Sequence, residues 1–368
     1  FKQKTAYEIM PSLVGSEMCI RDSLDVDGFS RVSRATLQSL RSGQTEYGQI
    51  PNYAMFKGNR IVDFSYYAAD STLWWIIGMY YYYKATGDRG FVKTNWDCLT
   101  KAMRFVNSQV IDRSGLVDHG EAADWMDSSV GRRGKVFYTN CLYFKAVDVM
   151  NRLADEFGGC RDLRDPSDVK ERINLIFWPQ EGGKKYLFTK NKKFFEEVID
   201  PWRDHYINYM SFEYVGNRCD VLANVLAILW KIADRKQIKK IKSYFKKKHV
   251  ADPYPVKVLW PQIFYPNPTW NPKVDLYREE QNRSLPFCYH NGGIWPFVGG
   301  LYVMILDEDS ARSKLHDLAL ANRLGRRAWE FNEWIHGKTG QPRGARYQTW
   351  SAAGYVLAYE RCRGRSVW

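Results

Sequence analysis

Hydrophobic residues recur mostly every three to four positions from residue 24 onward, which is the period of an amphipathic helix. Two segments, 68–86 and 290–306, are apolar almost all round, and this is typical of inner helices covered by an outer layer. Only KKYLFTKNKKFFEEVID, residues 184–200, reads as a β-hairpin. The sequence therefore predicts about ten helices. They fall near residues 28–42, 68–86, 95–110, 135–156, 166–178, 216–233, 235–248, 290–306, 309–332 and 346–362.

The segments between the predicted helices are long and rich in Gly, Pro, Trp, Tyr and Asn, as in LWPQIFYPNPTWNPKVDLYREEQNRSLPFCYHNGG. Loops of this kind in a compact helical protein are more often functional than incidental. No change of composition and no flexible linker marks a domain boundary. We therefore expect a single helical domain with a loop-lined face.

Residues 1–23 are set apart, because KTAYEIMPSLVGSEMCIRDS resembles translated sequencing-adapter read-through. The stretch lacks the basic start and continuous apolar core of a secretory signal. We therefore exclude it from the fold, and we expect it to pack poorly and to contribute little to stability. On this interpretation the natural N-terminus is missing, with any targeting signal, and the folded domain comprises residues 24–368.

Composition narrows the class of protein. The 14 Trp and 24 Tyr residues permit flat platforms for sugars or bases as well as core packing. No apolar run approaches the roughly 20 residues of a membrane span. Seven scattered cysteines without a C-x-x-C pair argue against a disulfide framework or a zinc site. A reducing, cytoplasmic setting is the simpler expectation.

The formal net charge of +13 comes largely from RKQIKKIKSYFKKKH, residues 235–249. Ile238, Ile241 and Phe245 keep helical spacing there, while lysines take the remaining faces. This is the pattern of an ordinary amphipathic helix with a solvated basic side. No recognised nucleic-acid-binding motif accompanies it, so we expect neither nucleic acid nor a membrane as a partner.

Acidic residues gather in HGEAADWMDSSVGRRGKVFYTN, where Glu121, Asp124 and Asp127 surround a Trp and a Met. One interpretation is that an acid here, or Ser128, only begins the following helix, since Asp and Ser are common N-caps. A second acid of similar character favours chemistry instead. Glu333, in WEFNEWIHGKTGQPRGARYQTWSAAGY, also lies beside a Trp, at the predicted end of a helix, where a carboxylate gains nothing from the helix dipole.

Two carboxylates among aromatic side chains are what acid/base cleavage of a glycosidic bond requires. One protonates the leaving oxygen, and the other activates water or attacks the sugar carbon. An apolar neighbourhood disfavours the ionised form, so the adjacent Trp and Met would keep Asp127 protonated if they line its pocket. Asp127 is therefore the candidate acid and Glu333 the candidate base, with Asp124 and Glu121 as the next candidates for the acid.

Five segments carry a resemblance to a known family. In chain order they are AADSTLWWIIGMYYYYKATGD, ADWMDSSVGRRGKVFYTNCLYFKA, NRCDVLANVLAILWKIAD, YHNGGIWPFVGGLYVMIL and FNEWIHGKTGQPRGARYQTWSAAGYVLA. They resemble the motifs of six-hairpin (α/α)6-barrel glycosidases, in particular the glycogen-debranching amylo-α-1,6-glucosidases and the neutral/alkaline invertases. The resemblance runs from about residue 28 to residue 362. It implies an all-α (α/α)6 toroid of twelve helices with a small β-hairpin insertion, so a count of about ten indicates that the first hairpin is missing.

The resemblance also implies roles for individual residues. Asp127 of ADWMD matches the general acid, and Glu333 of FNEW matches the general base of an inverting reaction. Asp70 of AADSTLWW matches a position that binds sugar hydroxyls, although a helix cap is an equally good interpretation. We expect Trp125 and Trp334, next to the acids, to form sugar platforms. The other expected sugar-binding residues, for which polar packing is the alternative, are Asp124, His290, Asn291, Gln348 and Trp350. The resemblance implies no metal and no cofactor.

The sequence favours an inverting, exo-acting glycoside hydrolase that acts on an α-glucosidic substrate such as a 1,6-linked branch glucose. The acid segment is nearer the debranching-type sequences, whereas YQTWSAAGY is nearer the invertases, so sucrose is the alternative substrate. A non-catalytic carbohydrate-binding barrel is the alternative from a different class, and the retention of both acids argues against it. The oligomeric state is left open.

Overall fold

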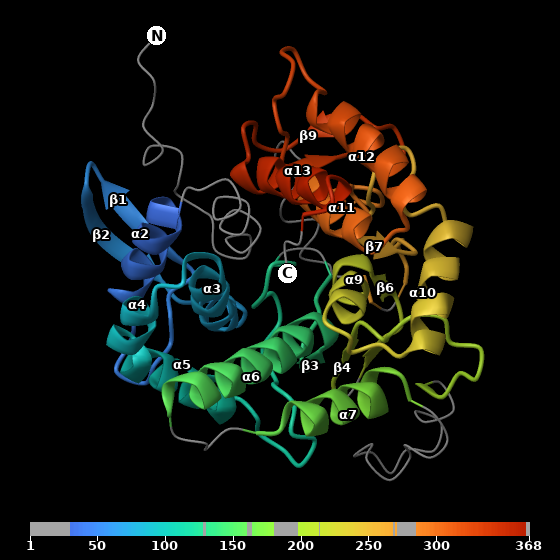
Figure 1. Ribbon diagram of the computed structural model, residues 1–368. Helices are drawn as coiled ribbons and strands as arrows, with labels where there is room; N and C mark the ends of the chain where they lie inside the picture. Colours follow the sequence, from blue (N-terminus) through green and yellow to red (C-terminus); the bar gives the residue numbers. More distant parts are fainter. Residues whose placement is uncertain are drawn as a thin grey trace.

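The computed structural model describes residues 30–127, 130–159, 164–179, 198–212, 214–267, 269–270 and 285–365. In this part of the chain, ten helices of nine or more residues alternate between an outer and an inner place in a ring (Figure 1). The outer helices are α2 (Ser30–Arg41), α5 (Trp96–Ser108), α7 (Pro166–Phe177), α10 (Arg235–Lys247) and α12 (Glu308–Asn322). The inner helices are α3 (Ser71–Thr86), α6 (Phe137–Phe157), α9 (Val221–Leu229), α11 (Pro296–Met304) and α13 (Thr349–Cys362). A short helix, α4 (Arg89–Thr94), lies between α3 and α5.

Burial separates the two layers. Each inner helix contacts the next, in the order α3, α6, α9, α11 and α13. All nine residues of α11 are buried, and α3 is buried on almost every side. In contrast, α10 buries one face, formed by Gln237, Ile241, Tyr244 and Phe245. The predictions of apolar inner helices and of a solvated basic helix are confirmed.

All ten predicted helices are present, but three of them are much shorter than predicted. Helix α9 covers only Val221–Leu229 of the predicted 216–233. Helix α11 begins only at Pro296, because proline is preorganised for the first helical position and two glycines precede it. Helix α12 ends at Asn322. Trp329 and Phe331, which extended the helical period, have positive φ angles of 63° and 44°, and a right-handed helix does not contain such residues.

The predicted helical fold is confirmed in its main part, but short strands that were not predicted order the loops. The largest pair is an antiparallel hairpin of β1 (Tyr53–Lys57) and β2 (Arg60–Ser65). The others are two residues long: β3 (Lys135–Val136), β4 (Tyr209–Met210) and β5 (Val215–Gly216) in one sheet, β6 (Cys219–Asp220) with β7 (Leu259–Trp260), and β8 (Trp334–Ile335) with β9 (Pro342–Arg343). Strands β3 and β6 lead directly into inner helices α6 and α9, so they fix where those helices begin.

Three expectations fall outside what the structure describes. The predicted hairpin at 184–200 lies almost wholly within residues 180–197, outside the described residues, and the segment 1–23 is outside them as well. The missing first hairpin stays a prediction. Among the described residues, no helix is both long and apolar enough to cross a membrane.

Candidate active site

A cavity of about 320 Å³ lies at the end of the ring where inner helices begin. Asp70, Trp295 and Gln348 line it, and they occupy the N-cap positions of α3, α11 and α13. The cavity collects most of the predicted site residues from distant parts of the chain. These are Asp70, Asp124, Trp125, Asp127, Glu333, Gln348 and Trp350. It is also lined by Asn52, Tyr53, Tyr67, Ala68, Tyr289, Trp295 and Phe297.

The loop before α6 contributes Asp127 to the cavity. Its side chain is 43% exposed, and its Oδ1 atom lies 4.0 Å from His290 Nδ1. The alternative that an acid of this loop begins the next helix is wrong for Asp124 and Asp127, because Val136 is the N-cap residue of α6 and no side chain caps the helix there. Ser128 lies outside the described residues. Asp127 therefore has no capping role, and its place on the cavity wall needs another explanation.

Glu333 reaches the cavity from the other end of the chain. It lies in the loop just before β8, eleven residues beyond the end of α12, so the prediction of a helix-terminal position is wrong. Its backbone N–H donates to the carbonyl of Ala345 at 2.8 Å, and its Oε2 accepts from the N–H of Ala345 at 2.9 Å. This pair of hydrogen bonds orients the carboxylate against the strand that follows.

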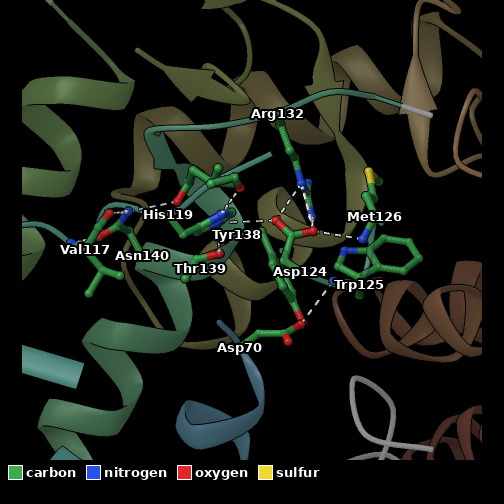
Figure 2. A network of polar contacts seen from close by, with 12 residues as sticks. Asp70, Val117, His119, Asp124, Trp125, Met126, Arg132, Tyr138, Thr139 and Asn140 are labelled. Carbon is green, nitrogen blue, oxygen red and sulfur yellow. Dashed lines mark hydrogen bonds and ion pairs between the residues drawn. The ribbon is translucent and has the colours of Figure 1, made fainter. Parts of the chain in front are cut away.

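The third acid group of the site, Asp124, is held by a buried guanidinium (Figure 2). Arg132 is fully buried, and its Nη2 and Nε atoms donate to Asp124 at 2.6 and 2.8 Å. The Nη1 atom donates at 2.5 Å to Asp220, the N-cap residue of α9. His119 Nε2 lies 3.5 Å from the same Asp124 carboxylate. Asp124 thus joins the acid loop to the core.

Asp70 occupies the N-cap position of α3, but its side chain makes no cap hydrogen bond. Its Oδ2 atom instead accepts from the Trp125 backbone N–H at 3.2 Å and from the Tyr138 hydroxyl at 3.1 Å (Figure 2). The cap interpretation is therefore wrong for this side chain. Burial, and then the nearby Asp124 carboxylate, raise the pKa of Asp70 to about 7. One buried guanidinium cannot neutralise three buried carboxylates, those of Asp70, Asp124 and Asp220.

Because the pKa of Asp70 is raised in the folded chain, we expect the free energy of unfolding to depend on pH. Below about pH 4 the carboxyl is protonated in the folded and the unfolded chain, whereas between about pH 4 and pH 7 only the folded chain retains the proton. This group therefore favours folding less as the pH rises through that window. Asp70→Asn keeps an acceptor oxygen but cannot ionise. Its free energy of unfolding, relative to that of the native chain, should therefore be higher at pH 8 than at pH 5. We expect more than about 1 kcal/mol, since one pKa unit corresponds to about 1.36 kcal/mol. Urea denaturation at both pH values measures this difference, and parallel pH profiles of the two proteins would contradict it.

Comparison with protein families matches residues 29–357 of the chain to the family described as amylo-alpha-1,6-glucosidase. The chain belongs to this family. It is 25% identical over 326 residues to the probable alkaline/neutral invertase D of Arabidopsis thaliana. This match covers 78% of the chain and 59% of that relative. It is 24% identical over 328 residues to cytosolic invertase 1 of Oryza sativa subsp. japonica, with 78% and 56% covered. The chain thus spans somewhat more than half the length of these relatives.

Solved structures share the fold of this amylo-alpha-1,6-glucosidase family member. The GH63 mannosylglycerate hydrolase from Thermus thermophilus, in complex with glucose, has a TM-score of 0.64 at 15% identity, covering 95% of this chain and 93% of that one. The GH78 family rhamnosidase of a Bacillus species has a TM-score of 0.53 at 16% identity, covering 93% of this chain and 31% of that one. The mostly helical ring is that of six-hairpin glycosidases, and the predicted family resemblance is confirmed.

In this family member, aromatic rings form one wall of the cavity. Trp125 is half-buried and packs edge-on against Trp295 and Phe297, each with ring centroids 5.5 Å away. Trp350 stacks on Phe297, also at 5.5 Å. Trp125 thus lines the cavity, and its role as a sugar platform stays a prediction, while the neighbouring Met126 is buried and does not line the cavity.

Three predicted residues do not line the cavity. His290 is buried behind the lining residues: its ring stacks on Trp295 at 5.0 Å, and its Nδ1 atom lies 4.0 Å from Asp127 Oδ1. Asn291 bridges the backbone of Ile263, accepting from its N–H at 2.7 Å and donating to its carbonyl at 2.9 Å, so the packing alternative describes it. Trp334 is fully buried, so the expected sugar platform there is not supported by its position.

Other lining residues were not predicted. Tyr67 directly precedes one of the motifs that the resemblance singled out, and Tyr289 is the first residue of another, so these motifs were a usable signal. Asn52 and Tyr53 reach the cavity from the β1 region, and nothing in their local sequence indicates this. Among the described residues, no group of three or more His, Cys, Asp and Glu side chains is arranged to hold a metal ion.

Proposed function

We propose that this chain is an inverting glycoside hydrolase in which Asp127 is the general acid and Glu333 the general base. The observation that carries the proposal is that these two carboxylates, 206 positions apart in the sequence, line one cavity of about 320 Å³. Asp127 would protonate the leaving oxygen, and Glu333 would activate the water that attacks from the opposite face of the sugar. Membership of a glycosidase family supports this chemistry.

The other two acids of the loop suit the acid role less well. Asp124 also lines the cavity, but its carboxylate is bound by the buried Arg132. Glu121 does not line it, and its side chain lies 3.7 Å from Arg133. Asp127 combines partial exposure with a place on the cavity wall, and this supports its assignment.

An α-glucosidic substrate cleaved from a chain end is the first candidate. The family description points to a 1,6-linked glucose. A cavity of this volume suits a terminal sugar better than the middle of a chain. Sucrose is the second candidate, and the similarity to plant invertases specifically favours it.

A sugar-release screen separates these candidates. The chain would be incubated with isomaltose, limit dextrin, trehalose and sucrose, and proton NMR would follow the anomer first released. Release of β-glucose from isomaltose or limit dextrin supports the proposal, because inversion at an α-linkage gives the β-anomer. Release from sucrose alone selects the second candidate. Binding of sugars without cleavage, in a folded chain, would show a non-catalytic barrel.

Gly344 offers a test of the position of Glu333. Its φ is +71°, and a Cβ added there would lie 2.5 Å from Glu333 Oε2 and 2.7 Å from Glu333 Cβ. Gly344→Ala should therefore displace the proposed base and lower kcat by about tenfold or more, since small misplacements of catalytic groups are costly. The matched control is Gly58→Ala, with a φ of +63° and nothing within 4 Å of the added Cβ. It carries the same backbone strain but should retain its kcat, and equal losses in the two variants would contradict the prediction.

A further inference from the structure

A second hollow, the basic cavity, is open to the surface, has a volume of about 480 Å³ and lies at the C-terminal end of α10. It shares no lining residue with the candidate active site. Four lysines line it: Lys247, Lys248, Lys257 and Lys338. Among its described lining residues, Asp252 is the only acid, so the wall carries a clear excess of positive charge.

The one acid of the basic cavity is already engaged. Asp252 Oδ2 lies 2.9 Å from His249 Nδ1, and its Oδ1 lies 3.9 Å from Lys314 Nζ. Lys257 is buried, and its Nζ donates to the backbone carbonyls of His249 and Asp252. These contacts give the cavity a fixed frame, and they leave little negative charge to balance the other lysines.

The remaining lysines have no acidic partner in the part of the chain that the structure describes. No carboxylate there forms an ion pair with Lys247, Lys248 or Lys338. Burial, followed by the charges of Arg343 and Lys338, lowers the pKa of the adjacent His336. A dianion placed in the basic cavity would be attracted by several of its lysines at once.

The basic cavity also has an aromatic wall. Trp260 and Phe287 line it, both half-buried. Lys257 Nζ lies 5.7 Å from the centre of the Trp260 ring. A cation thus lies beside an aromatic ring, and this combination suits the hydroxyl groups and the apolar face of a sugar.

We propose that the basic cavity binds a hexose phosphate. The phosphate dianion would be held by Lys247, Lys248 and Lys338, and the sugar ring would lie on Trp260. The volume suits a small molecule. This site is separate from the proposed catalytic function and does not depend on it.

The same two segments border both cavities. In the first segment, Phe287 lines the basic cavity and Tyr289 lines the candidate active site. In the second segment, Gly337 lines the basic cavity and Glu333 lines the candidate active site. The Gly337 N–H donates to the Phe287 carbonyl at 2.8 Å and ties the two segments together. A ligand in the basic cavity would therefore contact the segments that carry the catalytic candidates.

Isothermal titration calorimetry of the full chain tests the proposal with four probes: glucose 6-phosphate, inorganic phosphate, glucose and adenosine monophosphate. We expect saturable binding of glucose 6-phosphate that is tighter than that of the other three. The double variant Lys247→Gln/Lys338→Gln should weaken this binding by at least about tenfold, because it removes two charged hydrogen-bond donors. The matched control is Lys236→Gln/Lys239→Gln on the exposed side of α10, which removes the same charge outside the cavity and should leave the affinity unchanged.

Several results would overturn the proposal. One is the absence of saturable glucose 6-phosphate binding. Another is an equally weakened affinity in the control variant, which would indicate general charge attraction. Unchanged binding in the cavity variant would mean that the ligand occupies another site, such as the candidate active site. Equal or tighter binding of inorganic phosphate or adenosine monophosphate would exclude a sugar phosphate as the ligand class. Melting temperatures of both variants near that of the native chain show that folding does not cause the effect.

Discussion

Replacing Asp127 by Asn should slow the hydrolysis of ordinary sugar substrates at least about a hundredfold, in line with the usual worth of a general acid. The substitution keeps the shape of the side chain and removes the proton that the leaving oxygen needs. A glycosyl fluoride should lose much less, because fluoride leaves without protonation. Steady-state kinetics with both substrates measures the contrast.

Glu333→Gln is the companion variant, and it should behave differently. Without a base the attacking water is not activated, so both the sugar and the fluoride should be cleaved slowly. The amide oxygen of Gln can still accept the Ala345 N–H, so the loop should keep its place. Equal losses on both substrates for Asp127→Asn, in a folded protein, would show that Asp127 is not the acid.

Removing the buried guanidinium should have the largest effect on stability. Arg132→Leu leaves Asp124 and Asp220 buried without their cation, and breaking a buried ion pair in this way typically costs about 3–5 kcal/mol. Urea denaturation at pH 7 should show this loss. The loss should shrink at pH 5, because carboxylates without a counter-ion take up protons more readily and neutralise themselves.

The next residue in the chain provides the control. Arg133 has a side chain that is 38% exposed, and it lies 3.7 Å from Glu121. Arg133→Leu removes the same charge from the same loop, but exposed pairs contribute only about 0–1 kcal/mol. A small effect of Arg132→Leu, similar to that of Arg133→Leu, would contradict the role we assign to the buried ion pairs.

The helices could be predicted because their signal is local. A helix that is buried on one side repeats its apolar residues every three or four positions, and an inner helix such as α11 is apolar throughout. The ends of the helices were harder. Apolar residues in the loop after α12, such as Trp329, kept the helical period although their backbone is not helical, because they pack against the ring from a loop.

The candidate site could be predicted in part. Acids beside aromatic residues indicated Asp127 and Glu333, and the structure places both on one cavity. The same pattern could not separate Trp125 from Trp334, since each stands beside an acid. Only the first lines the cavity, while the second is fully buried. Arg132 and Arg133 are likewise adjacent in GRRGK, and nothing local shows which one is buried.

The sequence by itself determined the helical class, two of the inner helices and the two acids worth testing, because these follow from residue type and spacing. The tertiary structure decided which side chains share a space. Asp124 became the partner of a buried guanidinium, Asp70 became a buried acceptor for Trp125 and Tyr138, and Asp127 remained on the cavity wall. The physical reason is that burial and charge pairing arise between segments far apart in the chain, and it is these interactions that decide whether an acid stabilises the fold or is placed for chemistry.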